Sequence, residues 1–256
     1  MEISSFELIY KPQSPVGPAD TVLQGYFLNI TNLENEELFY RLDFVTSSIS
    51  DPDRSLFNNT AAIIDTPNQN NQPANLVGAL TSSSFRLSPN ITVPPDGTAK
   101  VAVLPSDPFP MPTSPANFEA RGYVTIRLPA RLVFDPPFIR FEPQLNRPAR
   151  VLLTPQNRAA YLDENNDIND QTQASLPTGT GSAIVEVVPE RGFFVPLAQG
   201  MADRLTSVDL STLPDLTEEN LAMMLAAVSA SDVDLKKFNS ELKKAGIGIA
   251  LEKRKV

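Results

Sequence analysis

The distribution of proline is the feature of this sequence that most constrains its fold. The chain has 24 prolines, which stand at short intervals from Pro12 to Pro214, and none follows that position. Proline removes a backbone donor and ends helices, so the apolar runs between the Pro, Asn, Asp and Ser clusters are typical of short strands and loops. After Pro214 the sequence is rich in Ala, Leu, Met, Glu and Lys, which favours helices. We therefore expect a β-rich part followed by a helical C-terminal part.

Alternation of apolar and polar residues predicts the strands. The pattern is clearest in the segment 37–46, where one face carries Leu38, Tyr40, Leu42 and Phe44. This is the period of a half-buried antiparallel strand. The polar turn at 32–36 joins it to the preceding run and predicts a hairpin over 23–46. The expected strands are 5–10, 23–31, 37–46, 61–65, 84–87, 98–104 and 121–128. Their density indicates a sandwich or a barrel and not βαβ units.

Three of these segments carry a family resemblance. They are 25–44 (GYFLNITNLENEELFYRLDF), 91–104 (ITVPPDGTAKVAVL) and 122–128 (GYVTIRL). A strand that ends in Asn, a polar turn, a strand of the form Y-x-L-x-F and a V-P-P-x-G-x-A turn together resemble an immunoglobulin-like β-sandwich over residues 1–130. The resemblance implies an antiparallel sandwich, an architecture that serves many different functions.

The middle of the chain is less regular. Four runs could add strands, namely 132–134, 138–141, 150–153 and 182–188. Between the last two lies a polar stretch, 154–181, which we expect to be a long loop, functional or disordered. No linker of flexible composition lies near residue 130. We therefore expect residues 1–190 to form one sandwich with extra strands, and 191–256 to contain a linker and a helical hairpin.

The expected loop contains the candidate metal ligands Asp163, Asn165, Asp167 and Asn169. Oxygen ligands at this alternate spacing are those that calcium prefers. The match to a helix-loop-helix calcium loop fails, since Ile168 stands where that loop needs Gly and Ala174 where it needs Glu. Asn and Asp also favour turns by themselves. Two interpretations stay open, a solvated turn and a weak calcium site, and calcium is the one cofactor considered.

The C-terminal segment has the pattern of two short helices. Thr217 is suited to cap the first and Ser231 the second, and Gly246 is suited to end the second. Apolar residues follow at helical spacing: Leu221, Met224, Leu225 and Val228 in the first, and Leu235, Phe238 and Leu242 in the second. Helices of this length are marginal alone, so their apolar faces must pack on something.

The charges and aromatic residues around these helices suggest where contacts form. Residues 206–235 carry six acids and no bases, whereas 236–256 carry seven bases and two acids. Helix dipoles and solvated faces explain part of this pattern, and docking of the basic end on an acidic neighbouring copy is the alternative. The candidate docking residues for the tail or a partner are Phe193, Phe194, Leu221, Leu225, Phe238, Lys253, Arg254 and Lys255.

Composition excludes several functions. The 256 residues include no Cys, no His and no Trp, which removes disulfide frameworks, thiolate nucleophiles and every Ser-His or Cys-His catalytic arrangement. The net charge of −9 argues against nucleic acid as the main partner.

No apolar run approaches the ~18 residues of a membrane helix. The first five residues, MEISS, lack the layout of a secretory signal, which predicts a cytoplasmic protein or one assembled without such a signal. The absence of Cys suits the cytosol and also bacterial surface modules.

These observations favour a non-catalytic structural protein over an enzyme. We expect it to self-associate or to join a larger assembly of proteins through its sandwich edges and its helical tail. The alternative is a ligand-binding or adhesive module for calcium, glycans or another protein. A hydrolase that uses paired carboxylates is the third hypothesis. It ranks last because the position of two acids side by side in the sequence does not give their separation across a substrate.

Overall fold

The computed structural model describes residues 1–12, 21–46, 56, 59–67, 71–78, 82–106, 118–135, 138–163, 165 and 167–196. Within these ranges there is no helix, and therefore none that is long and apolar enough to cross a membrane. The described chain falls into two compact units, one formed by Met1–Leu128 with Arg147–Val188 and the other by Pro129–Asn146 with the described residues from Pro189 to Pro196. The strands of the first unit are β1 (Glu2–Pro12), β2 (Thr21–Asn32), β3 (Leu38–Thr46), β4 (Thr60–Asp65), β5 (Gln72–Val77), β6 (Ser84–Ser88), β7 (Ile91–Val93), β8 (Thr98–Pro105), β9 (Phe118–Arg127), β12 (Ala149–Leu162), β13 (Ile168–Ser175) and β14 (Ile184–Val187).

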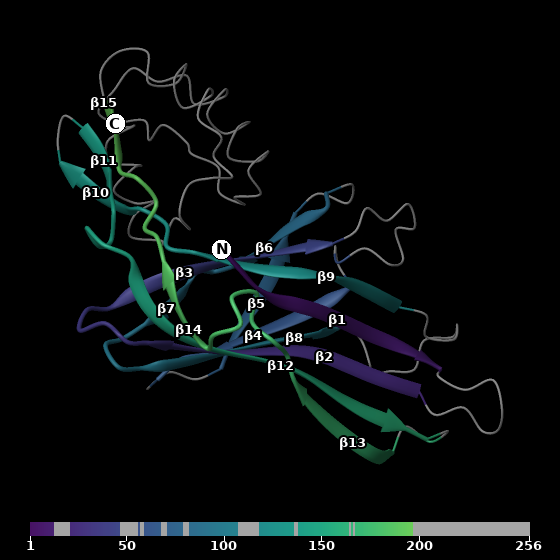
Figure 1. Ribbon diagram of the computed structural model, residues 1–256. Helices are drawn as coiled ribbons and strands as arrows, with labels where there is room; N and C mark the ends of the chain where they lie inside the picture. Colours follow the sequence, from purple (N-terminus) through teal and green to yellow (C-terminus); the bar gives the residue numbers. More distant parts are fainter. Residues whose placement is uncertain are drawn as a thin grey trace, which may run out of the picture. The chain divides into compact units, whose positions relative to one another are not determined.

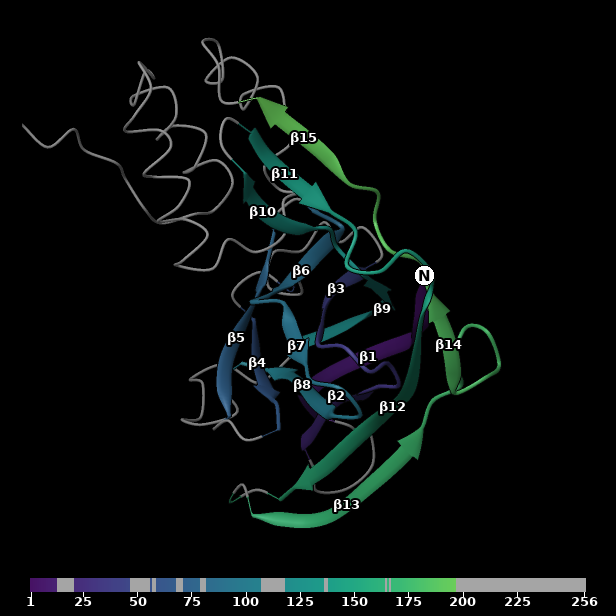
Figure 2. The same ribbon diagram turned by 90° about the vertical axis from the view of Figure 1, so that its left-hand side faces the viewer.

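The first unit is built on a closed antiparallel barrel of eight strands (Figures 1 and 2). Hydrogen bonds link the strands in the order β1-β9-β3-β6-β5-β4-β8-β2, and β2 pairs with β1 to close the ring. The expected mainly-β character is confirmed, but the immunoglobulin-like sandwich was wrong. Inward-outward alternation is the same in both architectures, so it could not show that the strands β4, β5 and β6 join the two sides into one continuous ring.

Strand β2 makes the closure possible because it has three partners. β12 pairs with β2 along all of Thr21–Asn32. The other edge of β2 is therefore shared, by β1 at residues 21–24 and by β8 at residues 26–31. Strand β12 thus lies outside the barrel and extends its sheet.

The barrel interior is filled by side chains. Its aromatic centre consists of Phe6, Tyr26 and Phe44, with ring centroids 5.3 Å apart for Phe6 and Phe44 and 5.8 Å apart for Tyr26 and Phe44, both in edge-to-face orientation. The Tyr26 hydroxyl lies 3.0 Å from the Ser4 hydroxyl, which satisfies the polar end of the buried ring. Burial raises the pKa of Tyr26. The barrel is a packed core, as expected for eight strands.

The segment expected to be a long loop is instead part of the sheet. Strand β12 continues to Leu162, a short turn follows, and β13 returns antiparallel to it from residue 168 to 175. Strand β14 pairs with the first part of β12, from Ala149 to Leu152. The expected polar loop over 154–181 is therefore largely a β-hairpin, and Figures 1 and 2 show β13 on the side of β12 away from β2.

The second unit contains a three-stranded antiparallel sheet. Its strands are β10 (Arg131–Asp135), β11 (Phe138–Glu142) and β15 (Phe193–Pro196), in the order β10-β11-β15. The Gln144 side chain donates to the Pro129 carbonyl oxygen at 2.8 Å and ties together the two ends of the β10–β11 segment. The predicted helical hairpin at residues 217–246 lies outside the described residues.

Candidate functional site

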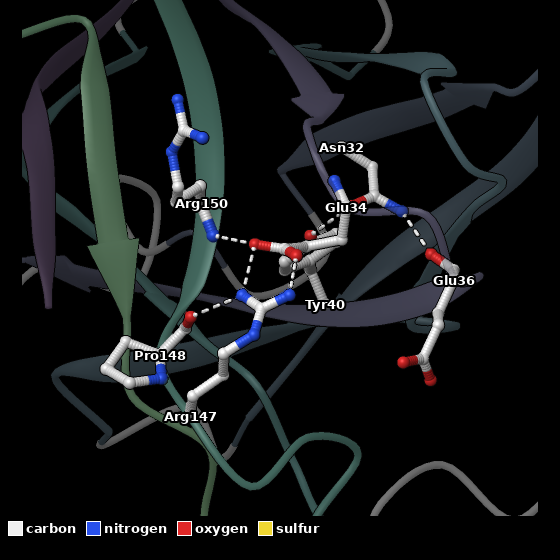
Figure 3. A network of polar contacts seen from close by, with 7 residues as sticks. All are labelled: Asn32, Glu34, Glu36, Tyr40, Arg147, Pro148 and Arg150. Carbon is white, nitrogen blue, oxygen red and sulfur yellow. Dashed lines mark hydrogen bonds and ion pairs between the residues drawn. The ribbon is translucent and has the colours of Figure 1, made fainter.

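The most buried carboxylate of the described residues is Glu34, in the turn between β2 and β3 (Figure 3). Its side chain is 4% exposed and forms a two-pronged ion pair with Arg147: Nη1 donates to Oε1 at 3.0 Å and Nη2 donates to Oε2. The backbone N–H of Arg150, in β12, also donates to Oε1, at 2.7 Å. The hydrogen bond from Arg147 is the main reason why the pKa of Glu34 lies below its usual range.

Asn32 holds the same turn from the other side. Its side-chain N–H groups donate to the carbonyl oxygens of Glu36 at 2.7 Å and Val93 at 3.1 Å. Its Oδ1 accepts from the Glu34 N–H at 3.1 Å and from the Tyr40 hydroxyl at 3.4 Å. Glu34 is thus held as an anion with both oxygens occupied, an arrangement that joins the β2–β3 turn to β12 and does not suit proton transfer at neutral pH.

The predicted calcium ligands lie in and beside the turn between β12 and β13. Oδ1 of Asp163 accepts the backbone N–H groups of Asn165 at 2.8 Å and Asp167 at 2.9 Å, and the Asp163 N–H donates to the Asp167 carbonyl oxygen at 3.0 Å. Asn169 is in β13. In the part of the chain that the structure describes, no three acidic side chains are grouped so that they could hold one metal ion. Calcium binding at this turn stays a prediction.

The structure describes few of the predicted partner-binding residues. Phe193 and Phe194 are in β15, opposite Phe141 and Arg140 of β11. Leu221, Leu225, Phe238, Lys253, Arg254 and Lys255 lie outside the described residues. None of the described contacts tests a partner at these positions.

A different surface, the open edge of β13, was missed by the sequence analysis. All eight residues of this strand are exposed. On one side β13 pairs with β12 through Gln156–Leu162, and on the other it has no strand partner among the residues described here. Its sequence, INDQTQAS, contains a single charge, Asp170, and no Lys or Pro.

The hydrogen-bond pattern shows which backbone groups of β13 face outward. The Leu176 N–H donates to Pro155 O, and the Leu153 N–H donates to Ala183 O, so odd-numbered residues of β12 face this side. Antiparallel ladders alternate strictly between hydrogen-bonded and non-hydrogen-bonded pairs. Even-numbered residues of β13 therefore bond to β12, and the backbone groups of Gln171, Gln173 and Ser175 face the open edge.

One of these outward donors is already occupied. The Gln171 N–H donates to Oδ1 of the neighbouring Asp170 at 2.7 Å. This bond agrees with the alternation, because a donor used by β12 would not be available to that side chain. A register shift near Asn169, at the other end of the strand, leaves residues 170–175 as the regular part of the edge.

The strand behind this edge is held firmly against the barrel. The guanidinium carbon of Arg158 lies 4.7 Å from the centroid of the Phe27 ring of β2, and Arg158 Nη2 donates to Gln156 Oε1 at 3.0 Å. Arg158 is directly opposite Gln173 of β13. This cation–aromatic contact adds to the ladder that joins β12 to β2 along Thr21–Asn32, and β12 in turn carries β13.

One feature of the sequence could have indicated β13, since no Gly or Pro occurs between Pro155 and Pro177. The segment 168–175, however, contains no apolar run that would show a buried face. A strand exposed on both faces has no alternation, so periodicity predicts a loop. Comparisons with protein-family models, curated proteins and solved structures gave no match for this chain.

Proposed function

We propose that this protein is a non-catalytic structural protein that self-associates, and that the open edge of β13 is its contact surface. The observation that carries the proposal is an eight-residue strand, exposed along its whole length, at the end of a sheet anchored on a closed barrel. An unpaired strand edge presents a row of backbone donors and acceptors to which another strand can add.

The residues of β13 support association. Proteins commonly protect an exposed edge with Lys, Pro or inward-pointing charges, and β13 has neither Lys nor Pro. Its Gln, Thr, Asn and Ser side chains are compatible with a hydrated interface. The edge of β12 beside it is already covered by β14 and β13 themselves, and β13, with eight residues, is the longer of these two strands that end the sheet in the described part of the chain.

The buried carboxylate supports a structural role for the rest of the unit. Both oxygens of Glu34 are used by Arg147 and Arg150, which fix the start of β12 on the β2–β3 turn. The network thus positions the strand that carries β13.

The test compares two substitutions at Gln173 in the full chain. The N–H of Gln173 faces the open edge, so Gln173→Pro removes an outward donor and leaves the β12–β13 ladder intact. Gln173→Thr keeps the donor and is the matched control. Mass is measured by light scattering over a series of concentrations, with electron microscopy of the same samples and melting temperature as the check on folding.

We expect the wild-type chain and Gln173→Thr to form oligomers. The dissociation constant of the Gln173→Pro oligomer should be about tenfold higher, because two hydrogen bonds are lost at each symmetric contact. A mass equal to one chain at every concentration would overturn the proposal. Equal association of the two folded variants would remove β13 as the contact surface.

A further inference from the structure

We infer that β13 pairs with β13 of a second copy of this chain, antiparallel and with Thr172 beside its own symmetry mate. The inference rests on the proposed function, because it specifies the partner and the register of the same edge. It commits to a second copy because the hydrogen-bond alternation and the side chains of β13 match those of a second β13 in one register, in which the single charge of each strand lies far from its mate.

The alternation of backbone groups limits the possible registers. In a two-fold antiparallel pair, outward-facing residues of one strand must oppose outward-facing residues of the other. In β13 these are odd-numbered, so the numbers of two opposing residues must sum to an even value. The two longest pairings that fulfil this condition place either Gln171 or Thr172 on the two-fold axis, and each pairs seven residues of β13.

The charge of Asp170 decides between these two registers. With Gln171 on the axis, Asp170 and its symmetry mate are offset by two residues, about 7 Å along the strands. With Thr172 on the axis, Asp170 lies opposite Ala174 and the offset is four residues, about 14 Å. The second distance exceeds the screening length of ~8 Å at physiological salt, so like-charge repulsion across the pair is small.

The register with Thr172 on the axis also matches the side chains. Gln171 opposes Gln173 of the second copy on one face of the sheet, where two amides can donate to and accept from each other. Thr172 opposes Thr172 on the other face, in a non-hydrogen-bonded pair whose Cα atoms are ~4.5 Å apart. Threonine pairs at such positions stabilise antiparallel sheets. An extended segment of unrelated sequence would share the backbone bonds without these side-chain matches.

The chain itself offers a clean probe of this register, because it contains no Cys. A disulfide requires Cα atoms within about 7 Å, which the axial pair fulfils. Thr172→Cys and Ala174→Cys introduce one thiol each on the same face of β13, two residues apart, in exposed positions. Each full-length variant is oxidised with diamide, and covalent dimer is followed on non-reducing gels.

We expect Thr172→Cys to form covalent dimer at least about tenfold faster than Ala174→Cys, whose Cα atoms would lie ~14 Å apart along the strands. Adding Gln173→Pro to Thr172→Cys should abolish the difference. Equal rates at the two positions, or faster reaction at Ala174→Cys, would overturn the register. The register and the proposed function can fail separately. If the wild type associates and Gln173→Pro weakens association, but Thr172→Cys does not cross-link, the inferred register fails and the proposed function stands. If Gln173→Pro has no effect on association, β13 fails as the contact surface.

Discussion

At the scale of single residues, Gly122 shows how closely the barrel strands approach each other. Gly122 is in β9, between Phe6 of β1 and Thr46 of β3. A Cβ atom at this position would lie 1.9 Å from the Val45 carbonyl oxygen and 3.0 Å from the Phe6 ring. Because the obstacle is backbone, the neighbouring strand itself would have to move.

We therefore expect Gly122→Ala to lower the free energy of unfolding by about 3 kcal/mol, the upper part of the range for overpacking, as measured by urea denaturation. Gly181→Ala is the control. Gly181 has a φ of 74° with open space around it, so the substitution should cost only the ~1 kcal/mol of a left-handed backbone. Equal losses for the two variants would contradict the steric explanation.

At the scale of elements, the ion pair between the β2–β3 turn and β12 predicts how stability depends on pH. The folded-state pKa of Glu34 lies below its usual value, so the pair stabilises the fold above the unfolded pKa of about 4.3 and is lost as pH falls through the folded pKa. Glu34→Gln should lower the free energy of unfolding by about 1–3 kcal/mol at pH 7. The difference from the wild type should shrink below about pH 4.

Urea unfolding at pH 7 and below about pH 4 measures this effect. Glu36→Gln is the matched control, because Glu36 is in the same turn and its carboxylate is exposed and points away from the network (Figure 3). A gap between Glu34→Gln and the wild type that stays constant from pH 7 to the acid range would show that the charge of Glu34 is not what stabilises the turn.

The open edge of β13 carries its own partial protection, the bond from the Gln171 N–H to Asp170. A second strand must displace this bond to reach the donor. Asp170→Ala removes this bond and leaves the Gln171 N–H free for a second strand. A hydrogen bond to a charged acceptor contributes about 1.5 kcal/mol, so the substitution should strengthen association about tenfold in light scattering. Asp170→Asn keeps the acceptor oxygen without the charge and should change association less. Weaker association of Asp170→Ala would mean that Asp170 contributes to the contact.

At the scale of the whole molecule, net charge determines how association responds to salt. Each copy carries −9, so two copies repel each other at long range. Raising NaCl from about 0.05 M to about 0.5 M shortens the Debye length about threefold and should strengthen association through β13. If the basic segment 236–256 docks on an acidic neighbour, salt should weaken association, because screening weakens attraction between opposite charges.

Concentration-dependent light scattering at the two salt levels distinguishes pairing through β13 from docking of the basic segment. Association weakened by salt would contradict pairing through β13.

The sequence by itself determined that the described chain is mainly β and where most of its strands lie. The alternation over 37–46 predicted β3, and proline with Asn, Asp and Ser clusters marked the breaks between strands. These are local properties, because the fit of a side chain to one face of a strand depends on its neighbours two residues away.

Tertiary structure alone decided the barrel, the ion pair and the open edge. Closure depends on the pairing of Ile9–Pro12 with Thr21–Gln24, and on β12 occupying the opposite edge of β2. Glu34 and Arg147 are 113 residues apart in the chain and meet only because β12 lies beside β2. Strand β13 has no buried face, so it forms only because β12 offers it hydrogen bonds, and no local pattern records that partner.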